Sequence, residues 1–177
     1  MKKIALVGAA LALSMAAGSA LAANSMNTGT MGFNVNTSDN TMINGKYFIA
    51  KDMAVLGGFG LGINGGDAKG TDIELLAGVR KYMKTDDFAP FMGGRFEYSS
   101  TQDSNVKNLS ILAEAGAEYF LAKQFSLEGR VGFGYVSKET ITAGTTTVGG
   151  FTFPTSAKSK TTYIGTGAAS LSANFYF

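Results

Sequence analysis

The charged side chains with which this chain could do chemistry are those of lysine, arginine, aspartate and glutamate, because it has neither histidine nor cysteine. It therefore lacks the usual base for a serine nucleophile, a reactive thiolate and the common ligands of transition metals. We predict no enzyme activity, no catalytic or metal-binding residue and no cofactor. What remains is a set of nine charged residues that share one side of alternating segments: Lys46, Glu74, Arg80, Arg95, Glu97, Glu114, Glu118, Glu128 and Arg130.

The segments that carry these charges alternate apolar and polar residues with a period of two, which is typical of β-strands. In one of them, Leu127 and Phe133 fall on one side, and Glu128 and Arg130 fall on the other. The same alternation predicts eight strands, at 28–37, 42–49, 53–63, 72–82, 90–99, 109–120, 125–136 and 161–177. The connections between them are short at 50–52, 84–88 and 122–124, and mostly longer and polar near 38–41, 64–71, 100–107 and 138–160. Short turns at one end and longer loops at the other are typical of outer-membrane barrels.

The residues on the two faces of these strands indicate which face points into the barrel and which points outward. The apolar face holds almost no charge, with Lys81 as the main exception, whereas the charged face is rich in glycine, which suits a crowded interior. Aromatic residues on the apolar face form two groups, which match the two interfaces of a bilayer. One group lies near the short turns and one near the longer loops: Tyr47, Tyr119, Phe125, Phe175 and Phe177, and then Tyr98, Tyr135 and Tyr163. We predict an all-β fold, an eight-stranded antiparallel up-and-down transmembrane β-barrel. A soluble barrel of lipocalin type, with the apolar face inward, is the alternative.

Residues 1–22 have the three parts of a secretory signal peptide: two lysines, an apolar run from Ile4, and a small-residue cleavage motif that ends at Ala22. We predict that this segment is removed and that 23–177 form one barrel domain; an uncleaved membrane anchor is the alternative. Removing two of the 15 basic residues leaves 13, which equals the 13 acidic residues. This balance predicts no nucleic-acid partner. No later apolar run is long enough to predict a membrane-spanning helix.

The signal segment, the recurring "YF-x-A-K/D" hairpins and the terminal "ANFYF" resemble the small eight-stranded outer-membrane proteins. That group includes the opacity-protein-like porin family and the membrane domain of outer-membrane protein A. The resemblance implies an integral protein of the outer membrane of a Gram-negative bacterium, surrounded by lipid and lipopolysaccharide. It also implies that the barrel-assembly machinery recognises the final strand during biogenesis, through Leu171, Ala173, Phe175 and Phe177. The enzymes of similar architecture use a catalytic histidine, which this chain lacks.

Two regions leave the function open. The nine charged residues would be either an ion-pair network that fills a closed lumen, which we favour because eight strands leave little room, or a gated ionic constriction. The longest predicted loop, 138–160, would be either a turn between extended strands or an adhesive tip with Phe151 and Phe153 exposed to an extracellular ligand. We therefore expect a structural or surface-interaction (adhesin-like) role, with a small passive porin for ions or small solutes as the alternative.

Overall fold

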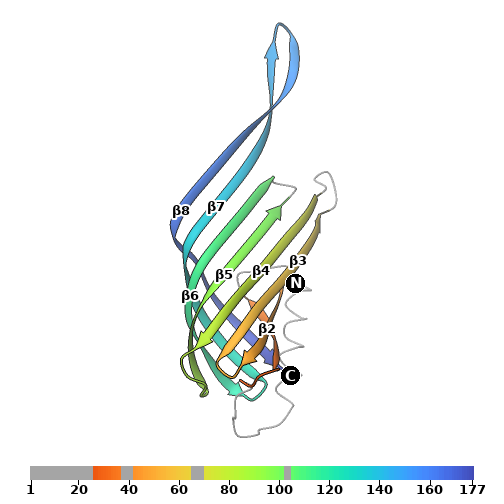
Figure 1. Ribbon diagram of the computed structural model, residues 1–177. Coiled ribbons are helices and arrows are strands. Elements are labelled where there is room, and N and C mark those ends of the chain that lie inside the picture. The colour runs from red at the N-terminus through yellow and green to blue at the C-terminus, as the bar shows by residue number, and fades with distance from the viewer. Residues whose placement is uncertain (1–25, 37–41, 65–69, 102–104) are drawn as a thin grey trace.

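The computed structural model describes residues 26–36, 42–64, 70–101 and 105–177, in which eight antiparallel strands form a closed barrel (Figure 1). The predicted signal segment 1–22 lies outside the described residues. Each strand pairs with the next strand in the chain, and the first strand pairs with the last. The strands are β1 (Met31–Asn36), β2 (Met42–Ala50), β3 (Met53–Asn64), β4 (Gly70–Tyr82), β5 (Phe88–Thr101), β6 (Val106–Ala122), β7 (Phe125–Val148) and β8 (Phe151–Tyr176). The predicted fold class is confirmed in its all-β, eight-stranded, antiparallel form. No helix in the described part of the chain is long and apolar enough to cross a membrane.

The prediction of a long loop at 138–160 is wrong, because this segment continues β7 and β8 as one long hairpin. Their ladder runs without a break from the pair Phe133 and Thr166 to the pair Val148 and Phe151. The connection consists of Gly149 and Gly150, whose φ angles of 60° and 82° are those of a tight hairpin turn that glycine adopts without strain. Figure 1 shows this hairpin extending well beyond the other strands. The structure thus contains the turn between extended strands that one interpretation of this segment predicted.

The barrel buries its polar face and exposes its apolar face. Large apolar side chains point outward on all eight strands, and Val131 is 58% exposed and Leu171 67% exposed. On the inward side, by contrast, Glu118 is fully buried and Arg80 is 2% exposed. Lys81, the charged exception on the outward face, forms an ion pair at the short-turn end with Asp52. Its ammonium group donates a hydrogen bond that holds the pKa of the Asp52 carboxyl below its usual range.

A register shift between β7 and β8 changes the face on which one predicted outward aromatic residue lies. Gly132 of β7 pairs with Ala168, but Phe133 pairs with Thr166, so β8 contains an extra residue at this point. Because a strand changes face at each residue, the extra residue exchanges the two faces of β8 beyond it. Ile164 consequently pairs with Tyr135, whereas Tyr163 pairs with Val136. The prediction that Tyr163 shares the outward face with Tyr135 is wrong.

The short-turn end of the interior is filled by an aromatic cluster. Five rings from five strands pack there, with neighbouring centroids 5.5–6.1 Å apart: Phe48, Tyr82, Phe91, Phe120 and Tyr176. Phe91 lies over Gly116, where a Cβ atom would collide with the Phe91 ring and with the carbonyl of Gly129. Met26 and two alanines complete the cluster. This aromatic layer lies directly next to the charged residues, since the Phe91 ring contacts Arg80.

Candidate functional site

The charged residues of the interior meet in one buried layer next to the aromatic cluster. Glu114 and Glu118 come from β6 and Glu128 from β7, and the register places Glu118 directly opposite Glu128. Two like charges in opposite positions destabilise a sheet unless cations neutralise them. The cations come from several other strands and from β7 itself: Lys46 of β2, Arg80 of β4, Arg95 of β5 and Arg130 of β7. These seven residues are all at most 6% exposed.

Glu118 is the most fully bonded group of the layer. Its carboxylate accepts a hydrogen bond from Lys46 Nζ at 2.8 Å and one from the Tyr82 hydroxyl at 2.8 Å. Further hydrogen bonds come from the hydroxyls of Ser126 and Tyr176 and from the amide of Asn174 at 3.1 Å. A buried carboxylate with five donors is compensated for the loss of water, since charged hydrogen bonds replace its hydration. The four uncharged donors were not predicted as part of the site.

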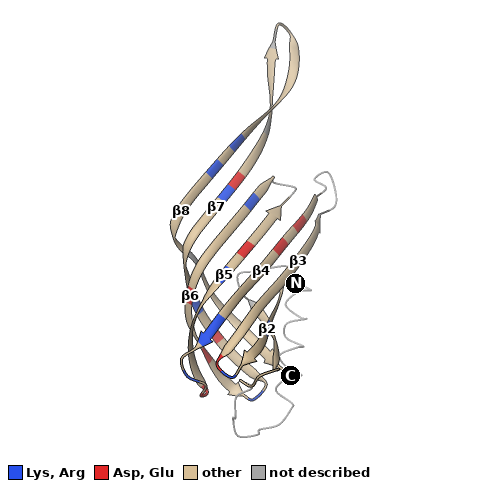
Figure 2. Ribbon diagram, viewed as in Figure 1, with Lys and Arg blue, Asp and Glu red and all other residues tan. Residues whose placement is uncertain are grey.

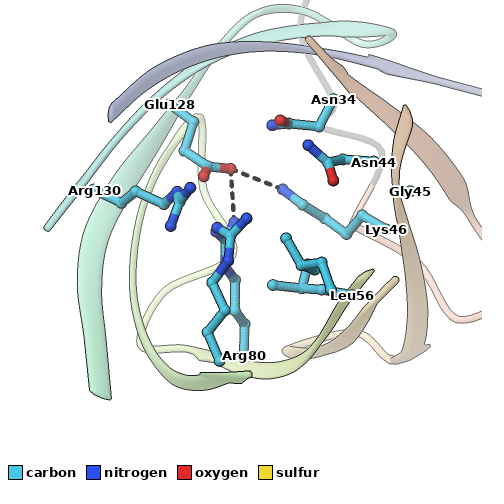
Figure 3. Close-up of a pocket in the computed structure, with 10 residues that line it drawn as sticks. Asn34, Asn44, Gly45, Lys46, Leu56, Arg80, Glu128 and Arg130 are labelled. Atoms are coloured by element: carbon cyan, nitrogen blue, oxygen red, sulfur yellow. Dashed lines mark hydrogen bonds and ion pairs between the residues drawn. The ribbon is translucent and has the colours of Figure 1, made fainter. Parts of the chain in front are cut away.

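Arg80 and Lys46 join the carboxylates across the lumen. Arg80 Nε lies 2.5 Å from Glu114 Oε1, and its Nη1 lies 2.7 Å from Glu128 Oε2. Lys46 Nζ reaches the same oxygen of Glu128 at 3.2 Å (Figure 3). The Arg80 guanidinium also stacks on the Phe91 ring, with its Cζ atom 4.1 Å from the ring centroid. Arg80 therefore ties β4 to β6 and β7 and rests on the aromatic cluster.

The outer side of the layer is less tightly bonded. Arg95 Nη1 lies 3.8 Å and Arg130 Nη1 lies 3.6 Å from the same oxygen of Glu114, so this carboxylate is surrounded by three arginines. Arg95 Nε lies 2.5 Å from Glu97, whose side chain is partly exposed. With Glu97 included, four bases face four acids, and such mutual pairing compensates for their desolvation.

A cavity of about 20 Å³ adjoins this outer side, lined by Asn44, Leu56, Arg130 and neighbouring residues (Figure 3). Among the described residues, neither the buried amide of Asn44 nor Arg130 Nη1 has a hydrogen-bond partner. A space of this size holds about one water molecule. The described interior therefore contains a small polar cavity at this level.

Ion pairs join eight of the nine predicted charged residues in one network. Glu97 belongs to the eight through its ion pair with Arg95. Glu74, the ninth residue, lies six residues before Arg80 on β4. It pairs with Gly60 of β3 and Ser99 of β5 and is half-buried.

The residues predicted as an assembly signal lie at the contact of β8 with β1 and β7. Leu171 points outward, and the Phe175 ring packs on Phe125 with 5.1 Å between centroids. Ala173 is half-buried and pairs with Val35. The backbone of Phe177 exchanges two hydrogen bonds with Met31, at 3.0 and 3.2 Å.

The predicted surface-contact residues lie at the tip of the long hairpin. Phe151 is 72% exposed and Phe153 is 54% exposed, and they pair with Val148 and Thr146. Both rings are far from the charged layer along the hairpin, so the candidate site has two separate parts: a closed interior and an exposed tip.

No protein-family model matches this sequence, and a comparison with curated proteins finds no match. The comparison with known proteins therefore depends on the arrangement of the strands. The closed, eight-stranded, antiparallel barrel is consistent with the fold of small outer-membrane barrel proteins.

Proposed function

We propose that this protein is an integral outer-membrane β-barrel of the small eight-stranded type, related to the opacity-protein-like porins or the membrane domain of outer-membrane protein A. In this proposal the barrel is a sealed support, and its outer hairpin has a structural or surface-interaction role. The observation that carries the proposal is the inverted arrangement of faces, with charged residues buried inside and apolar residues exposed outside.

The exposed apolar surface supports a lipid environment. Soluble monomers rarely expose a contiguous apolar patch larger than a few hundred Å². Here, large apolar side chains are exposed on the outward faces of all eight strands, for example Phe33, Phe59 and Phe96. Lipid would cover such a surface, and closure of the barrel pairs the first strand with the last, as a sheet in lipid requires.

The filled interior supports a sealed lumen. The aromatic cluster blocks one end, and Arg80, Lys46 and the glutamates fill the next layer. The observation that favours the alternative, a small passive porin, is the cavity beside Asn44 and Arg130. Its volume of about 20 Å³ is that of a water-sized space rather than a continuous channel.

The outer hairpin supports a surface-interaction role. Among the described residues, 142–148 of β7 and 151–160 of β8 have backbone pairing partners only in the opposite strand of the hairpin. Both strands therefore have a free edge, to which an extended segment of a partner can add by main-chain hydrogen bonds. Phe151 and Phe153 would provide apolar anchors beside that edge.

Conductance in planar bilayers tests the sealed lumen. We expect the refolded full chain to give no steady current under conditions in which a porin of known conductance does. Heat-modifiable migration on a gel would verify that the inserted protein is folded. A steady current whose ion selectivity changes in Arg130→Gln would contradict the sealed support and would establish the small passive porin.

A further inference from the structure

Four of the lysines gather at the rim where β6, β7 and β8 leave the barrel. Lys107 lies on β6, Lys138 on β7, and Lys158 and Lys160 on β8. Figure 2 shows these basic positions side by side on the outer parts of the three strands, with one acidic position among them. The acidic position is Glu139, which pairs with Lys107 on one side and with Lys160 on the other.

Three of the four lysines share the outward face. Side chains alternate faces along a strand. Lys107 lies two residues before Leu109 and four before the exposed Ile111, so all three share the outward face of β6. Glu139 is in the same column as Phe133 on β7, and Lys158 pairs with Ile141 two residues farther out. Lys138 has the opposite parity and pairs with Asn108 and Thr161. Lys107, Lys158 and Lys160, which we call the lysine triad, therefore continue the outward apolar surface.

The lysine triad is only partly neutralised. Lys158 Nζ lies 2.8 Å from Glu139 Oε1. This hydrogen bond, assisted by the charges of all three lysines, holds the pKa of Glu139 below its usual range, so the carboxylate is ionised at neutral pH. Among the described residues of this rim, three ammonium groups and one carboxylate leave an excess of positive charge. Adjacent strands are about 5 Å apart, so Lys107 and Lys160 are separated by about 10 Å.

A hollow of about 290 Å³ adjoins Lys107. Ile73 and Ile141 give it apolar walls, and Thr71 and Ser100 give it hydroxyl groups. A hollow with apolar walls and a cation at its edge suits an amphiphilic ligand whose anionic head faces the cation.

We propose that the lysine triad and this hollow bind the phosphorylated headgroup of lipopolysaccharide in the outer leaflet. The ammonium groups contact the phosphates, and the hollow receives the adjoining part of the lipid. This inference depends on the proposed location of the barrel in the outer membrane. A lipid is favoured over a protein partner because the triad directly continues the outward apolar column of Leu109 and Ile111, at the level where headgroups begin.

The test is a binding titration of the refolded full chain in detergent with phosphorylated lipid A, followed by native mass spectrometry. The triple variant Lys107→Gln, Lys158→Gln and Lys160→Gln should bind about a hundredfold more weakly than the wild type. The matched control is Lys138→Gln, Lys84→Gln and Lys123→Gln, which removes the same charge from the opposite face and from the short turns. We expect this control to bind the lipid as tightly as the wild type does. Added salt should weaken binding by the control and by the wild type.

Dephosphorylated lipid A identifies the chemical group that is recognised. The wild type should bind it about as weakly as the triple variant binds the phosphorylated lipid. Equal binding of the two lipids, or equal binding by the triple variant and its control, would overturn the proposal, as would a preference for an anionic protein over the lipid. The detergent assay does not depend on cellular location, so membrane fractionation can contradict the proposed function separately while the phosphate preference remains.

Discussion

At the scale of single residues, Arg80 is the central connection of the interior. It bonds two of the three buried glutamates, whereas Arg130 approaches only Glu114, at 3.6 Å. Removing one partner of a buried ion pair leaves an uncompensated charge, which costs more than the pair itself contributes.

We therefore expect Arg80→Ala to lower the free energy of unfolding by about 3–5 kcal/mol. Arg130→Ala should lower it by less than half as much. Urea unfolding of both variants in lipid vesicles, followed by the heat-modifiable gel shift, would measure the difference. Equal losses in the two variants would mean that the network is not organised around Arg80.

The sequence predicts the inward side of these charges but not their partners. Alternation alone places Glu118 and Glu128 inward, and the short turn between their strands makes them opposite. Lys46, however, is 72 residues from Glu118 and reaches it across the lumen, which depends on barrel closure and strand tilt. The hydroxyls of Tyr82 and Tyr176 were missed because the predicted network was limited to charged side chains, although a buried tyrosine hydroxyl usually needs a partner.

At the scale of elements, the outer hairpin is where the predicted strand boundaries, 136 and 161, were wrong. The segment "TITAGTTTVGGFTF" is polar, and its polarity suggested a loop. Its threonines, valine and isoleucine nevertheless favour strands, and "GG" between them favours a tight turn. A hairpin that leaves the barrel needs no apolar face, so the alternation that identified the other strands is weak here.

An epitope inserted between Gly149 and Gly150 tests the position of this hairpin. We expect the barrel to keep its wild-type unfolding midpoint, because residues 142–148 pair only with β8 among the described residues. Antibody should label the epitope on intact cells, since the proposed topology places the hairpin outside. Labelling only after the outer membrane is broken would invert that topology.

At the scale of the whole molecule, the barrel closes along a short seam between β1 and β8. Within the described part of the chain, five residue pairs form this seam, from Gly32 with Tyr176 to Asn36 with Ser172. Phe177 extends it through its two backbone hydrogen bonds to Met31 and through its ring, 5.7 Å from Phe33. The seam is much shorter than the ladder between β7 and β8.

Deleting Phe177 should therefore reduce insertion into the outer membrane and leave unfolded protein in the periplasm. The reasons are the lost seam contacts and the proposed recognition of this residue by the assembly machinery. The conservative variant Phe177→Tyr, which keeps an aromatic ring, should insert normally. Normal heat-modifiable, membrane-inserted protein after the deletion would contradict both roles.

The seam also determines the order of folding events. Every other strand pair joins neighbours in the chain, so those hairpins close short loops, whereas Asn34 and Asn174 of the seam are 140 residues apart. The entropy lost in closing a loop increases with its length, and five residue pairs offset little of that loss until the other strands are in place. The seam is therefore the last ladder to form. Until it forms, β1 and β8 both present open edges that can pair with another chain and cause aggregation. A chaperone that covers these edges would prevent such pairing and leave the two strands available to each other.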